Sequence, residues 1–419
     1  REQAVIRALA RRYSPDPAAD RKALDAAYAD SMTEAARAFT GEGEVQVLLA
    51  DALMNLSPWD YWEADGATPK GRTAEIVAAL EAALRHDPEH PGAIHFYIHT
   101  VEASTTPERA EPYADRLAAL MPGAGHVVHM PSHIYYRVGR YKDSLAANVA
   151  AAAADEAYLR AVRADDAYAF GYYPHNVHFL LVSAQAGGDG PRAIEAATKL
   201  GRVTSDAVAR EVGWVQAIKT APYTAHAQFS PPDTVLALPE PAGGFPFVEA
   251  SWRYARAVAL AAKGDAAGAE AEGEAIARLA AHADFADLAT KGVPAADITA
   301  ISRHVIAGRV AQARGRHDEA ATAFREAAAI QDRLPYMEPP FWYYPVRQSQ
   351  GGALLAAGRH EEAADAFRDS LLRTPNNAYA LFGLAAAQKA AGDTTGAAVT
   401  EDRFRAAWSG EGVPDLAAL

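Results

Sequence analysis

The sequence predicts an all-α fold, a superhelix of stacked helix–turn–helix repeats. Three observations support this prediction. The segments between turns are rich in Ala, the residue with the highest helix propensity, as in the run 150–154. Turn glycines 34 residues apart, at Gly358 and Gly392, indicate a fixed repeat length, and so do the equally spaced prolines Pro88 and Pro122. Finally, glycine-containing turns between helical stretches recur at Gly139, Gly264, Gly315, Gly358 and Gly392.

The fixed period changes what the chain length means. A globular chain of 419 residues would normally split into several domains. In an array of repeats, the chain length reflects the number of repeats instead. The stretch 229–248 is rich in Pro and contains a Gly-Gly pair, which favours a loop or hinge. We therefore expect an N-terminal half over 1–228, a connection over 229–248 and a C-terminal half over 249–419.

Composition excludes several classes of function. With 40 Lys+Arg against 53 Asp+Glu, the net charge of −13 disfavours nucleic-acid binding. No apolar run approaches the ~20 residues that span a bilayer, so no membrane partner is expected. The absence of cysteine excludes thiolate metal sites, disulfides and cysteine nucleophiles. Because the first residue is Arg, any targeting segment would precede it, and a soluble, cytoplasmic location is the default expectation.

Seven of the 14 histidines gather between residues 95 and 178. In repeat register they fall on positions 2, 5 and 9 of three successive first helices, and the pairs one repeat apart are separated by 34 residues. These positions form one helical stripe, which in a superhelix of this kind lines the concave surface. The same stripe carries Glu102 and, one period later, Tyr136. The seven residues are His95, His99, His126, His129, His133, His175 and His178.

A histidine-rich stripe favours a metal site, although a groove that binds an anionic peptide or small ligand without metal remains an alternative. A lone histidine is more often a surface or core group than a ligand, and we interpret the other seven that way. Imidazole suits Zn, Cu, Fe and Ni. Copper is favoured, with iron or zinc as options. Either two ions share the groove with three imidazoles each, or some histidines support the ligands or act as general bases.

An aromatic block over 336–348 opens a predicted helix in the C-terminal half. Its four clustered aromatics either cap the solenoid core or form a substrate-facing wall, with Glu338 as a polar anchor. On the second interpretation Tyr172, Trp342 and Arg347 are candidate substrate-binding residues.

The 34-residue period, with Gly at the turn and Pro between units, resembles the tetratricopeptide repeat (TPR). The segments 53–62, 125–135 and 340–348 resemble a histidine-rich bacterial subgroup of that family without a settled activity. The resemblance implies a groove that binds peptides or proteins. Here imidazoles occupy groove positions where Lys, Asn or Arg are usual.

We therefore expect a metal-dependent enzyme, an oxidoreductase in preference to a hydrolase, acting on a small molecule or peptide in the groove. His95, His99, His129 and His133 are the expected core ligands, and His126, His175 and His178 would complete one or two sites. Glu102 would be a ligand or general base, and Tyr136 a contact to substrate or to a ligand. The alternative is a non-catalytic scaffold that binds a peptide or partner protein, with affinity tuned by histidine protonation. The oligomeric state is left open.

Overall fold

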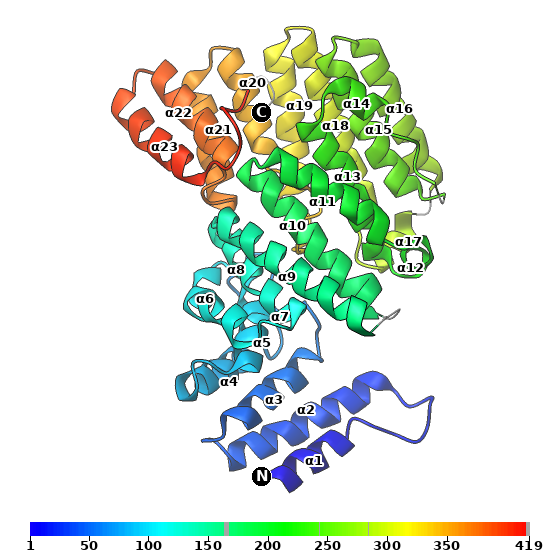
Figure 1. Ribbon diagram of the computed structural model, residues 1–419, viewed down its shortest axis with the longest axis vertical. Coiled ribbons are helices and arrows are strands. Elements are labelled where there is room, and N and C mark those ends of the chain that lie inside the picture. Colours follow the sequence, from blue (N-terminus) through cyan, green and yellow to red (C-terminus); the bar gives the residue numbers. More distant parts are fainter. Residues whose placement is uncertain (163–166, 243, 284, 416–419) are drawn as a thin grey trace. The chain divides into compact units, whose positions relative to one another are not determined.

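The computed structural model describes residues 1–162, 167–242, 244–283 and 285–415 (Figure 1). Helices make up most of this part of the chain, and its β structure is limited to an isolated bridge between Trp62 and Pro69. The chain divides into two compact units, Arg1–Val138 and Gly139–Leu419. The expected connection at 229–248 lies inside the second unit, where it contains a short helix and the start of a long one.

The first unit carries the helices that position five of the seven clustered histidines. Its core includes the fully buried Leu53, Leu80, Ile94, Ile98 and Leu117. The elements are α1 (Glu2–Ala10), α2 (Arg21–Ala38), α3 (Gly43–Met54), α4 (Thr73–His86), α5 (Pro91–Val101), the 3-10 helix η1 (Pro107–Ala110), α6 (Glu111–Leu120), α7 (Gly125–His129) and α8 (Pro131–Val138).

The second unit is a longer array, in which consecutive helices such as α15 and α16, α18 and α19, or α20 and α21 pack against each other. The predicted all-α, TPR-like stack of helix–turn–helix pairs is thereby confirmed. Its elements are α9 (Tyr141–Val162), the π-helix η2 (Tyr168–Tyr172), α10 (Tyr173–Gly187), α11 (Gly190–Val203), α12 (Asp206–Glu211), α13 (Gly213–Phe229), α14 (Pro232–Leu236), α15 (Pro246–Ala262), α16 (Ala266–His282), α17 (Phe285–Thr290), α18 (Ala295–Ala313), α19 (His317–Gln331), α20 (Val346–Ala356), α21 (His360–Arg373), α22 (Ala378–Ala390) and α23 (Thr394–Ala407).

A Gly-Asp turn ends one helix and begins the next at two of the predicted positions, Gly264 and Gly392, and also at Gly188. Gly264 has a φ of 80°, a left-handed conformation that residues with a Cβ rarely adopt. Asp265 follows it as the N-cap of α16, and its side chain accepts a hydrogen bond from the backbone N–H of Gly268. The same arrangement recurs at 188–189 and 392–393. These turns reverse the chain, so that the two helices of a pair pack side by side.

The segment with three clustered histidines departs from the expected single helix. The structure divides it into α7, with His126 and His129, and α8, with His133. Pro131 is the first residue of α8. Proline has no N–H for a helical hydrogen bond and its ring crowds the preceding turn, so it favours the start of a helix over an interior position. The break means that His133 need not follow the helical stripe set by α7.

Candidate metal centre

Helix α5 presents His95 and His99 on one face, because residues four apart in a helix lie one above the other. The helix begins at Pro91, and the imidazole of His90 caps it by accepting a hydrogen bond from the N–H of Ala93. The adjacent face, with Ile94 and Ile98 about 100° around the helix, is buried in the core of the first unit. The packing of the apolar face thus determines which way the two histidines project.

Five imidazoles from α5, α7 and α8 form a closed ring of contacts in the first unit. The centroids of His95 and His99 are 5.1 Å apart, and those of His95 and His126 are 5.0 Å apart. The centroids of His126 and His129 are 6.0 Å apart, and those of His129 and His133 are 4.6 Å apart. The ring closes between His99 and His133, whose centroids are 5.3 Å apart. The structure therefore brings together five of the seven predicted metal ligands.

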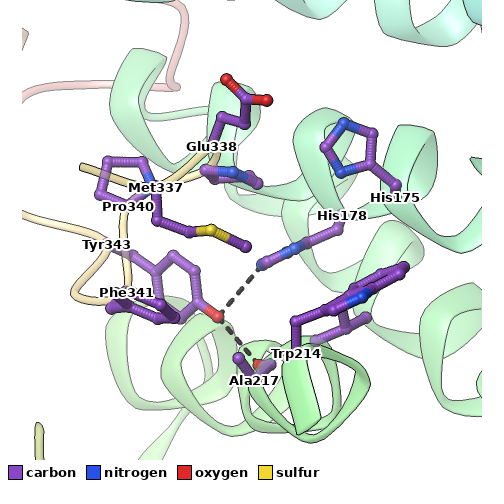
Figure 2. A pocket seen from close by; sticks show the side chains of 11 residues that line it. His175, His178, Trp214, Ala217, Met337, Glu338, Pro340, Phe341 and Tyr343 are labelled. Carbon is purple, nitrogen blue, oxygen red and sulfur yellow. Dashed lines mark hydrogen bonds between the residues drawn. The ribbon is translucent and has the colours of Figure 1, made fainter. Parts of the chain in front are cut away.

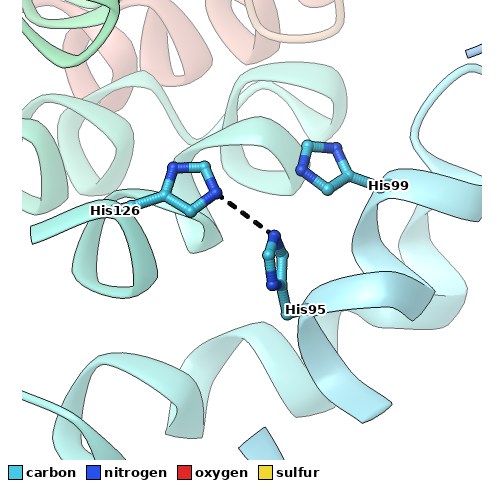
Figure 3. Close-up of side chains that lie close together, drawn as sticks. All are labelled: His95, His99 and His126. Carbon is cyan, nitrogen blue, oxygen red and sulfur yellow. Dashed lines mark hydrogen bonds between the residues drawn. The ribbon is translucent and has the colours of Figure 1, made fainter. Parts of the chain in front are cut away.

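Within this ring, His95, His99 and His126 form a group suited to one metal ion. One ligand atom from each lies within 4.8 Å of the other two. Figure 3 shows His95 and His126 pointing toward each other, with their Nε2 atoms 3.2 Å apart. Two nitrogens bound tetrahedrally at 2.0–2.1 Å from one ion would be about 3.3 Å apart. All three residues are partly exposed, which leaves access for a further ligand.

The protonation state of this group also suits a metal. Burial, with a smaller contribution from the neighbouring His99, lowers the pKa of His95 to about 2. Burial likewise lowers the pKa of His126 to about 3. Both rings are therefore neutral near pH 7, which is the form of imidazole that binds metal ions.

Glu102 holds two of the five imidazoles at once. Its carboxylate is 1% exposed, and it accepts hydrogen bonds from Nδ1 of His99 at 2.7 Å and from Nδ1 of His133 at 2.6 Å. Because an ionised carboxylate can only accept, both facing nitrogens carry the proton, which leaves the Nε2 atoms as the ones that could bind a metal ion. Hydrogen bonding of the outer nitrogen to a carboxylate is the usual support for a metal-ligating histidine.

His129 and His133 form a buried pair beside the three-histidine group. Their exposed fractions are 0% and 1%, so they do not line an open surface as the stripe predicts. Their Nε2 atoms lie 2.7 Å apart. Nδ1 of His129 is 3.2 Å from the hydroxyl of Ser132.

Sequence reasoning missed two residues that support the ring. Besides Ser132, Arg137 on α8 donates hydrogen bonds to the backbone oxygens of Glu102, at 2.8 Å, and Ser104, at 3.0 Å. These bonds tie the end of α5 to α8. The spacing of Ser132 three residues after His129 could have indicated its role, whereas nothing in the sequence pairs Arg137 with a carbonyl 35 residues away.

The other two predicted ligands, His175 and His178, lie on α10 in the second unit. His178 is 5% exposed, and its Nε2 lies 3.1 Å from the Tyr343 hydroxyl, which donates in turn to the carbonyl of Ala217 (Figure 2). A small pocket opens beside this pair, lined mainly by His175, Trp214, Met337, Glu338, Phe341 and Tyr343. Part of the predicted aromatic block therefore does surround a pocket.

His178 makes stability dependent on pH, because burial lowers its pKa from 6.5 to about 3. The unfolded chain binds the proton more readily, so the free energy of unfolding falls as the pH drops from about 6.5 toward 3. The expected slope is about 1.4 kcal/mol per pH unit for this residue. Urea denaturation of chelator-treated protein at several pH values should show a shallower dependence in His178→Phe. The exposed His282→Gln is the control, and equal slopes in all three proteins would contradict the prediction.

The remaining predicted site residues occupy varied surroundings. Tyr136 lies partly exposed on α8. Tyr172 is exposed in η2, and its ring is tilted against that of Tyr168, with centroids 5.7 Å apart. Trp342 packs in the core of the second unit against Tyr254, with ring centroids 5.2 Å apart. Contact of these three with a substrate stays a prediction.

Arg347, also predicted to bind substrate, already has an anionic partner. Its guanidinium forms a double ion pair with Asp332, with distances of 2.6 and 2.5 Å. A substrate anion would have to compete with this carboxylate.

Comparison with known proteins identifies similar folds but no related sequence. No protein-family model matches the chain, and no curated protein sequence matches it. Similar solved structures include a human IFIT1 dimer with m7Gppp-AAAA, at a TM-score of 0.36 and 13% identity over 92% of this chain and 78% of that chain. Yeast Tom70 has a TM-score of 0.32 and 11% identity over 91% of this chain and 88% of that chain. The TPR domain of P58(IPK) has a TM-score of 0.24 and 13% identity over 87% of this chain and 92% of that chain. These values are too low to transfer a function.

Within the described residues, no helix combines the length and the apolarity that crossing a bilayer requires.

Proposed function

We propose that this protein is a metal-dependent enzyme whose metal ion binds to His95, His99 and His126 in the first unit. The convergence of three imidazoles supports the proposal most directly: their ligand atoms lie within 4.8 Å of one another, and the Nε2 atoms of His95 and His126 are 3.2 Å apart.

The surroundings of the ligands support the same proposal. Glu102 accepts the Nδ1 proton of His99 at 2.7 Å, which leaves the Nε2 lone pair for an ion. In this arrangement Glu102 acts as a support for ligands, in preference to the roles of ligand or general base. Removing the support of a metal ligand typically weakens binding about 10- to 100-fold.

Three protein ligands leave at least one coordination position for water or substrate, which is the pattern of catalytic metal sites. The donor set is imidazole, which suits copper, iron and zinc, and we favour copper in an oxidoreductase. A small molecule or a peptide would reach the ion on the partly exposed side of the three histidines.

Metal analysis of tag-free protein tests the proposal. Protein expressed in metal-replete medium should retain at least one equivalent of Cu, Zn or Fe after gel filtration, and lose it on dialysis against a chelator. Reconstitution with each ion separately, followed by oxidase and hydrolase assays, then separates the reaction classes. A metal content far below one equivalent after both expression and reconstitution would contradict the proposal.

A non-catalytic scaffold is the second candidate, favoured by the stack of helix–turn–helix pairs itself. It would bind a peptide or a partner protein through its helices. The two candidates differ in their dependence on metal. If the protein is a scaffold, it should still bind its partner in a pull-down from a lysate after treatment with a chelator. If it is a metal enzyme, the same treatment should abolish its activity, and addition of the ion should restore it.

A further inference from the structure

We infer that the first unit binds a second metal ion, a divalent transition metal held by the Nε2 atoms of His129 and His133, beside the three-histidine site. The inference rests on the proposed function and extends it from one ion to two neighbouring ions. It assigns a role to the buried pair that the three-histidine site does not use.

The buried pair repeats the pattern of the three-histidine site. In both, Nε2 atoms of two rings face each other, at 3.2 Å in His95 and His126 and at 2.7 Å in His129 and His133. The outer nitrogen of His133 donates to Glu102 at 2.6 Å, as that of His99 does at 2.7 Å. Converging Nε2 atoms and an outer nitrogen held by a carboxylate, as in His99 and His133, are both common features of metal-ligating histidines.

The outer nitrogen of His129 is anchored as well, since the Ser132 hydroxyl lies 3.2 Å from Nδ1. If Ser132 donates this bond, His129 carries its proton on Nε2 and donates it to His133. If His129 donates from Nδ1 to Ser132, its Nε2 lone pair faces that of His133, and a cation between them removes the repulsion. The first arrangement is a plain hydrogen bond, and it is the alternative that the experiment must distinguish.

The separation of the two nitrogens requires only a small adjustment. At 2.0–2.1 Å from one ion, two nitrogens would be about 2.9 Å apart at the right angle of a square-planar Cu²⁺ or Ni²⁺ site, and about 3.3 Å apart in a tetrahedral Zn²⁺ site. The observed 2.7 Å is therefore about 0.2 to 0.6 Å shorter than a shared ion requires. Rotation of the rings about their side-chain bonds is the adjustment that the inference requires.

Glu102 links the two positions, because one oxygen holds His99 of the first group and the other holds His133 of the second. The rings themselves also meet, with centroids of His99 and His133 5.3 Å apart and those of His126 and His129 6.0 Å apart. Two ions bound at these positions would be close neighbours. Five imidazoles also exceed the three that one catalytic ion commonly takes from a protein.

Binding stoichiometry and copper spectroscopy test the inference on the full chain. Metal-free wild-type protein titrated with Zn²⁺ in a calorimeter should bind two equivalents, and the variant His129→Ala/His133→Ala should bind one. The control His86→Ala, an exposed histidine at the end of α4, should still bind two. One equivalent in the wild type would overturn the inference and leave the proposed function intact, whereas no binding would contradict both.

If the double variant fails to fold, electron paramagnetic resonance of the wild type tests whether a second ion binds beside the first. With one equivalent of Cu²⁺ the signal should integrate to one spin. With two equivalents, neighbouring ions should broaden the signal or reduce the spin count per copper. Two equivalents with full, unbroadened spin intensity would place the second ion elsewhere and overturn the inference.

Discussion

Replacing His126 with Ala is expected to weaken metal binding by ~100-fold or more while leaving the helices folded. The change removes one of three ligands, and even indirect supports of such ligands contribute about 10- to 100-fold. His126 is partly exposed on the short helix α7, so its loss leaves no large internal cavity. Competition with a chromophoric chelator measures the affinity, and circular dichroism of metal-free protein measures the helicity.

The matched control for His126→Ala is His86→Ala in the same unit. His86 is an exposed histidine in the last turn of α4, outside the ring of five imidazoles. Its substitution should leave the affinity for metal unchanged. Equal affinities of wild type and His126→Ala would contradict the three-histidine site, and a loss of helicity in His126→Ala would show that the residue is structural.

Replacing Phe367 with Ala is expected to reduce the free energy of unfolding by about 3–5 kcal/mol, the usual effect of removing a buried phenyl ring. The ring is fully buried on α21. It fills space left by two glycines on the flanking helices: a Cβ placed on Gly351 of α20 would lie 2.7 Å from the ring, and one on Gly383 of α22 would lie 2.2 Å from it. Without the phenyl ring, three successive helices lose their common contact.

The control for Phe367→Ala lies on the same helix. Leu372 is 81% exposed, so Leu372→Ala removes an apolar side chain with little burial. Its effect should stay within about 0.5 kcal/mol. Urea denaturation followed by circular dichroism measures both variants. Similar losses in the two would mean that α21 does not pack as the structure shows.

Much of the fold could be predicted from local sequence, because each repeat encodes its own helices and turn. The glycines at 264 and 392 adopt the left-handed conformation that their place at the turn predicts, and the aspartates after them cap the next helix. The limits of the compact units could not be predicted in this way. The prolines near 229–248 fall within the second unit, since a short Pro-rich connection does not prevent the helices on either side from packing together.

The candidate site was predictable as a group of residues but not as a set of contacts. Helical periodicity and the 34-residue repeat were sufficient to single out His95, His99, His126, His129 and His133, which the structure brings into one ring. Which nitrogen faces which, and which pair is buried, depend on side-chain rotamers and on the way neighbouring helices pack. No pattern within one helix contains that information.

The sequence by itself determined the all-α repeat architecture, the turns and the histidine-rich face, because these follow from short-range preferences that recur at a fixed spacing. Only the tertiary structure decided that His129 and His133 are buried as a pair with their Nε2 atoms 2.7 Å apart. It also decided that Glu102 joins His99 to His133 through its two oxygens. The physical reason is that a hydrogen bond requires placement to within a few tenths of an ångström, and residues 31 positions apart reach that accuracy only when their helices are packed.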